Sequence, residues 1–170
     1  MRRLLASLLL LSVLSACDPF VYEVDVPQLC LTAPGIPFSA DGSSAHASLP
    51  LDLGLEARLS EPGQSGEVEL LSVTLEGSPV LGDVTHATLT VEPASPAGPT
   101  VGQVHIQAQA ASQPGSSTLA IPGQGAELAG PIRSGSPQLG ITLAGPMSGG
   151  FTARVTTCVH VRLGKHYLQR

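Results

Sequence analysis

The chain has 170 residues, a formal net charge of −5, and 42% hydrophobic but only 3% aromatic residues. This length is enough for one domain with one hydrophobic core. An acidic chain with no Trp, three Phe and two Tyr lacks the basic surface and the stacking side chains that nucleic-acid-binding proteins use. We therefore expect no nucleic-acid partner.

The first sixteen residues have the three parts of a secretory signal peptide. Arg2 and Arg3 give residues 1–3 a basic character, residues 4–14 form an apolar run, and the small residues Ser15 and Ala16 follow. The run is shorter than the roughly 20 residues that a membrane-spanning helix needs. We expect export and removal of residues 1–16.

The sequence Leu14-Ser15-Ala16-Cys17 resembles the lipobox of bacterial lipoproteins, in which Leu and two small residues precede a Cys. The resemblance implies cleavage before Cys17, a diacylglycerol on the Cys17 sulfur, and often a third acyl chain on the new amino terminus. Residues 17–19 would then be the lipidated terminus, anchored to the inner or outer membrane of the cell envelope. Two or more acyl chains give stable anchoring. The alternative is an ordinary signal peptide cut near Ala16, which leaves Cys17 as a thiol.

Alternating apolar and polar residues predict strands along residues 20–170, which we expect to be a single domain. The first candidate is Phe20–Thr32, with a bulge at Pro27. The clearest alternation runs over Ala47–Leu59, with an edge or a bend at Pro50 because proline cannot donate a ladder hydrogen bond. Further candidates, the first of them with a bulge near Leu70-Leu71, are residues 68–75, 84–91, 104–110, 119–121, 139–143 and 151–163.

No stretch has sustained helical spacing, and the best candidate is one turn around Ala126–Arg133 that Gly130-Pro131 interrupts. Pro and Gly fall between the apolar stretches, as turn residues do. The predicted fold class is all-β. We expect an antiparallel two-layer β-sandwich, immunoglobulin-like or related, with about seven to nine strands and little helix.

Cys30 and Cys158 are the two cysteines that remain after Cys17. In an exported protein an even remainder predicts a disulfide, and two cysteines allow one connectivity. Both cysteines lie on the polar parity of their strands, so they can meet if the first and last strands pair in register. We expect that pairing, with Glu23 and Asp25 near Arg154 or Arg162. A metal or redox pair would lack the usual C-x-x-C spacing.

Charge is divided unevenly along the chain after residue 16. Residues 18–127 hold all thirteen acidic residues and one basic residue, Arg58, whereas residues 128–170 hold five basic residues and no acidic one. We favour the interpretation that early and late strands lie side by side and compensate each other. A dipolar surface that recruits a partner is the alternative.

The chain contains no recognised catalytic or phosphate-binding motif such as G-x-S-x-G, G-x-G-x-x-G or G-x-x-x-x-G-K. Ser148 lies in a turn of small residues and has no predicted base beside it. The five histidines form no metal-binding pair, the acidic cluster at residues 61–76 lacks the aromatics of a sugar cleft, and residues 41–44 lack a calcium-loop pattern. We expect no catalytic residues, no metal and no cofactor.

Two classes of function remain. The first is a non-catalytic envelope lipoprotein that is bound to the lipid bilayer through Cys17 and whose domain has a structural or protein-interaction role, with an envelope protein as partner. The alternative is an envelope enzyme or small-ligand carrier with a cavity between the sheets. Cys17 lies three positions before Phe20, so we expect the domain to lie close to the bilayer.

Overall fold

The computed structural model describes residues 20–92, 104–109, 114–135 and 137–167; the predicted signal peptide and Cys17 lie outside them. No helix in these ranges is long and apolar enough to cross a membrane. The described elements are β1 (Phe20–Ala40), β2 (Gly42–Pro50), α2 (Glu56–Leu59), β3 (Gln64–Glu76), η1 (Pro79–Asp83), β4 (His86–Glu92), β5 (Val104–Gln109), β6 (Thr118–Glu127), α3 (Ala129–Arg133), β7 (Gln138–Met147) and β8 (Phe151–Tyr167).

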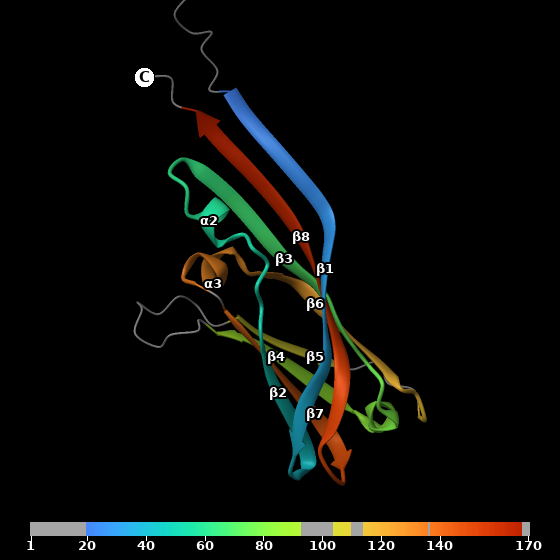
Figure 1. Cartoon of the computed structure of the whole chain (residues 1–170). Helices are drawn as coiled ribbons and strands as arrows, with labels where there is room; N and C mark the ends of the chain where they lie inside the picture. Colours follow the sequence, from blue (N-terminus) through green and yellow to red (C-terminus); the bar gives the residue numbers. More distant parts are fainter. Residues whose placement is uncertain (1–19, 93–103, 110–113, 136, 168–170) are drawn as a thin grey trace, which may run out of the picture.

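The eight strands are all paired antiparallel, in the order β5-β4-β7-β2-β1-β8-β3-β6. β1 belongs to both halves of this order, because it pairs with β8 from Phe20 to Phe38 and then with β2 at Ser39 and Ala40. The chain thus makes two four-stranded layers, β1-β8-β3-β6 and β2-β7-β4-β5 (Figure 1). This connectivity is a jelly roll, so the predicted all-β, two-layer class is confirmed.

The core lies between the two layers. The inward-facing side chains of one parity are buried along each central strand, as strict alternation requires. Each fully buried Leu or Ile contributes about 1.5–3 kcal/mol relative to an exposed one. The largest fully buried side chains are Leu70, Leu75, Leu81, Leu89, Leu119, Ile121, Leu128, Ile132, Leu139, Ile141, Leu143 and Met147.

Both predicted bulges are present. The register between β1 and β8 shifts between Val26 and Leu29, around Pro27. The register of β3 shifts between Leu70 and Ser72 against both of its neighbours. The extra residue in a bulge changes the parity of the strand, so apolar residues on both sides of it can face the core.

The predicted strand Ala47–Leu59 is correct only for its first four residues, which belong to β2, and wrong beyond Pro50. β2 ends at Pro50, and the chain then crosses the end of the sandwich and forms α2. Proline cannot continue the ladder, and Gly54 has φ of +64°, a turn conformation that glycine adopts without strain. The leucine alternation persists because this crossing also packs on the core, where Leu51 and Leu59 are buried.

The far edges of the two layers approach each other at β5 and β6. There the side-chain amide of Gln124 donates a hydrogen bond to the backbone oxygen of Gln107, at 3.0 Å. This contact nearly closes the sandwich into a barrel. The predicted helical turn near Ala126–Arg133 is present as α3, whose proline lies in the first turn, where a missing N–H is tolerated.

Candidate interaction surface

The charged residues of the early and late strands meet on the outer face of the layer β1-β8-β3-β6. Arg162 Nη1 lies 3.5 Å from Glu67 Oε2, and Arg154 Nη1 lies 3.6 Å from Glu76 Oε2. These pairs are about half exposed, so each is worth at most about 1 kcal/mol. Early and late strands therefore compensate each other as expected, although the acidic partners of both arginines come from β3 rather than from β1.

His160 lies between two carboxylates on this face. Its Nε2 is 2.6 Å from Asp25 Oδ1 on β1, and its Nδ1 is 3.7 Å from Glu69 Oε2 on β3. The His160 side chain is 15% exposed. Because the carboxylates contact opposite nitrogens of the ring, the three groups do not converge on one point. No His, Cys, Asp and Glu cluster that could hold a metal ion is found among the described residues.

The disulfide between Cys30 and Cys158 lies next to His160. The two cysteines are register partners in the β1–β8 ladder, as the sequence predicts, with Cα atoms 4.1 Å apart. The side-chain amide of Gln28 donates to both sulfur atoms, at 3.3 and 3.6 Å. Beyond the disulfide, the hydroxyls of Thr32 and Thr156 lie 3.1 Å apart. The disulfide thus joins β1 and β8 on their polar outer side rather than in the core, with Cys30 exposed and Cys158 8% exposed.

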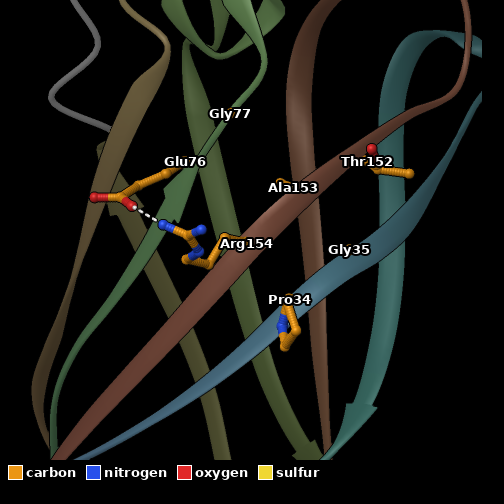
Figure 2. Close-up of a pocket in the computed structure, with 7 residues that line it drawn as sticks. All are labelled: Pro34, Gly35, Glu76, Gly77, Thr152, Ala153 and Arg154. Carbon is orange, nitrogen blue, oxygen red and sulfur yellow. Dashed lines mark ion pairs between the residues drawn. The ribbon is translucent and has the colours of Figure 1, made fainter.

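Two shallow hollows open on this outer face. One has a volume of about 280 Å³ and lies where β1 bends at Pro34 and Gly35. Figure 2 shows Glu76 and Arg154 pointing toward each other at its side. The second hollow, of about 250 Å³, lies near the start of β1 and is lined by Glu23, Ser65, Gly66, Glu67, Arg162, Leu163 and Gly164. Neither lining includes a histidine or cysteine that could activate a nucleophile.

The outer face of the other layer differs sharply in charge. Its strands β2, β7 and β4 present hydroxyl, imidazole and small side chains, and Glu92 at the end of β4 is the one acidic residue at an outward position of these described strands. The outward positions include His46, Ser48, Gly140, Thr142, His86, Thr88 and Thr90. Among the outward positions of the described strands, charge is therefore concentrated on the face of β1-β8-β3-β6.

The remaining residues that the sequence singles out lie apart from one another. Ser148 lies exposed in the turn between β7 and β8. In the β1–β2 turn, the backbone N–H groups of Ser43 and Ser44 donate to Asp41 Oδ1 at 3.1 and 2.8 Å. These hydrogen bonds, together with those from the two serine hydroxyls, lower the pKa of Asp41. The Asp41 carboxylate thus organises a turn. The side chains of His105 and His166 lie outside the described part of the chain.

The sequence did not indicate that His160 contacts Asp25, or that β3 supplies the acidic partners of Arg154 and Arg162. Strand parity places His160 and Arg162 on one face, but parity does not say which neighbouring strand supplies each partner. That choice depends on β8 lying between β1 and β3.

No protein-family model matches the chain, and no curated protein matches it. A solved structure from Desmodium yellow mottle tymovirus is similar, with 14% identity and a TM-score of 0.39 over 90% of this chain and 91% of that chain. One from turnip yellow mosaic virus has 18% identity and a TM-score of 0.34 over 88% and 95% of the respective chains. A structure of carbohydrate-binding modules from the β-sandwich superfamily has 12% identity and a TM-score of 0.34 over 79% and 54%.

Proposed function

We propose that this chain is a bacterial lipoprotein, exported, cleaved before Cys17 and held at the cell envelope by acyl chains on that cysteine. The observation that carries the proposal is the sequence Leu14-Ser15-Ala16-Cys17 at the end of an apolar run. The position of β1 supports it, because the described strand begins at Phe20, three positions after Cys17. The anchor then attaches almost directly to a strand of the domain.

The domain of this lipoprotein acts as a non-catalytic module that binds another protein of the envelope. Glu23 on the outer face of β1-β8-β3-β6 supports this role, because it is exposed and belongs to none of the ion pairs of the described residues, and complementary charge on a partner speeds and orients association. The alternative, a cavity enzyme or carrier, would use the space between the layers. Both hollows described above lie on the outside instead, and large apolar side chains fill the inner faces of the described strands.

The anchor also gives the domain an orientation. The start of β1 and the end of β8 are register partners at one end of the molecule (Figure 1). β1 has 21 residues, so its far end, at the β1–β2 turn, lies on the order of 60 Å along the strand from its start. In this proposal the domain begins at the bilayer, and its distal turns lie well away from it.

Replacement of Cys17 with Ser tests the anchor. We expect the wild-type chain to fractionate with membranes and to carry the mass of its acyl chains, and Cys17→Ser to lose both. The double variant Cys30→Ser/Cys158→Ser is the control for loss of cysteine, because it keeps Cys17 and should keep the acyl mass and the membrane fraction even though its fold is less stable. Firm membrane attachment of Cys17→Ser, or a wild-type chain without acyl mass, would overturn the proposal.

A further inference from the structure

The first strand has an unpaired side along most of its length. From Phe20 to Phe38 β1 pairs with β8 on one side, and β2 joins it only at Ser39 and Ala40. No described strand pairs with the other side of residues 20–38. In Figure 1 this stretch is the outer border of the upper part of the molecule. Such an edge presents backbone donors and acceptors to a strand from elsewhere.

The disulfide shows which backbone groups face that edge. In an antiparallel ladder, residue pairs with Cα atoms about 4.5 Å apart are the non-hydrogen-bonded pairs. Cys30 and Cys158, at 4.1 Å, are such a pair. The N–H and C=O of Cys30 therefore point away from β8, toward the open edge. Thr32 lies two residues further in the same unbroken register, so its N–H and C=O point the same way.

The apolar side chains of β1 are incompletely covered. Val26, Leu29 and Ala33 point into the core but are only half-buried. Their register partners on β8 are Val161, Val159 and Val155, which are 2%, 0% and 1% exposed. At these three paired positions the side chains of β8 are therefore fully covered, whereas those of β1 are only partly covered. An added strand would cover this stripe and gain about 25 cal/mol for each Å² removed from water.

The inward-facing side chains of the other edge strands are better covered. The inward-facing Ala45, Ala47 and Leu49 of β2, Ile106 of β5, and Leu119 and Ile121 of β6 are all at most 9% exposed. β5 and β6 also contact each other through Gln124 and Gln107. Among the described strands, β1 alone combines an unpaired backbone edge with a half-covered apolar stripe.

We propose that the free edge of β1 binds an extended segment of another envelope protein, which adds as a further strand beside residues 28–33. Pro27 and Pro34 bound this stretch, because neither can donate a hydrogen bond to an added strand. The proposal rests on the proposed function and names the partner's binding mode. The segment alternates apolar residues, which cover the stripe, with polar ones on the outer face.

Charge and orientation define the partner further. Glu23 and Asp25 lie exposed on the outer face of β1, and Glu23 forms no ion pair with another described residue. Basic residues on the polar side of the segment complement them. A second copy of this chain fits poorly, because antiparallel pairing of two β1 strands directs their amino termini, and hence their membrane anchors, in opposite directions.

The test uses a photo-crosslinking amino acid at exposed Gln28 in the full chain, expressed in its own cells. Ser48, an exposed residue of edge strand β2, is the matched control position. We expect an adduct from position 28 but not from position 48. Mass spectrometry of the adduct should identify a segment of another protein in which apolar and polar residues alternate. A crosslink to a second copy of this chain, or to a segment without alternation, would overturn the proposal.

Two pairs of substitutions test the binding mode in the same crosslinking assay. Thr32→Pro removes an edge N–H, whereas Thr32→Ala keeps it, and both lose the Thr156 hydroxyl contact. We expect Thr32→Pro to reduce the adduct about tenfold relative to Thr32→Ala. Glu23→Lys, which leaves every described ion pair intact, should reduce it about threefold relative to Glu23→Gln. Equal adducts within both pairs would contradict strand addition.

The crosslinking test of the β1 edge and the acylation test of the anchor can fail independently of each other. A chain that carries no acyl mass but still gives the position 28 adduct would remove the lipoprotein assignment and leave the edge proposal standing. An acylated chain that gives no adduct would remove the edge proposal and leave the lipoprotein assignment standing.

Discussion

Leu70 and Leu71 are adjacent in β3, yet Leu70 is fully buried and Leu71 is 37% exposed. Successive side chains of a strand face opposite sides, and the bulge between Leu70 and Ser72 then shifts the inward parity so that Val73 rather than Ser72 is buried. Leu70→Ala should lower the free energy of unfolding by about 2–5 kcal/mol, because it leaves a cavity in the core. Leu71→Ala should change it by about 0.5 kcal/mol or less. Urea unfolding of the two variants measures the difference, and similar losses would contradict the inward position of Leu70 and the outward position of Leu71.

The pairing of the first and last strands could be read from the sequence because two independent patterns agree. Strand parity puts Cys30 and Cys158 on polar faces, and the even cysteine count pairs them. The structure places them opposite each other. Parity failed after Pro50, since leucines that pack over the end of a sandwich can alternate like those of a strand. Instead of continuing as a strand, the chain turns at Gly54 and forms the short helix α2, whose residues favour helix.

The partners of the charged residues could not be predicted in the same way. The sequence suggests Arg162 beside Asp25, and the two are register partners, but Arg162 contacts Glu67 while Asp25 contacts His160. A central strand has a neighbour on each side, and long side chains choose between them in three dimensions. The sequence also could not show that β1 has an unpaired edge, because that depends on the order of the strands in the sheet.

The Cys30–Cys158 disulfide should stabilise the fold strongly. It closes a loop with a sequence separation of 128 residues. The chain-entropy relation gives about 5 kcal/mol for a loop of this size, by restricting the unfolded state. The double variant Cys30→Ser/Cys158→Ser should therefore unfold at a much lower urea concentration than the wild type. Cys17→Ser is the control and should match the wild type. A double variant within about 1 kcal/mol of wild type would show that the staple contributes little.

Gly123 lies where β6 passes close to the backbone of β3. A Cβ atom at this position would collide with the Leu70 carbonyl group and come within 2.7 Å of Leu70 Cγ. The backbone there cannot yield as a flexible side chain would, so Gly123→Ala should cost about 1–3 kcal/mol of unfolding free energy. Gly149→Ala is the matched control, because nothing lies within 4 Å of its Cβ and its φ is not positive. Equal midpoints for the two variants in urea would contradict the close approach.

The β1–β2 turn should contribute a pH-dependent part of the stability. Hydrogen bonds from the Ser44 and Ser43 backbone N–H groups lower the pKa of Asp41 in the folded chain. A carboxyl whose pKa is lower when folded stabilises the fold above its unfolded pKa. This contribution is lost as the pH falls through the folded pKa. Asp41→Ala should therefore be less stable than wild type at pH 7, and the part of this deficit that depends on the charge should start to shrink below about pH 4 and vanish once the pH is below the lowered folded pKa.

Urea midpoints of wild type, Asp41→Ala and Asp41→Asn between pH 7 and pH 2 measure this effect. Asn keeps an acceptor for the Ser43 and Ser44 N–H groups but carries no charge, so its deficit at neutral pH should be smaller than that of Ala. Glu61, whose pKa is lowered by its hydrogen bond and charge interaction with Lys165, titrates in the same acidic range. It is present in all three chains, so its contribution cancels in each comparison with wild type. A deficit for Asp41→Ala that stays constant from pH 7 to pH 2 would show that the charge of Asp41 does not stabilise the turn.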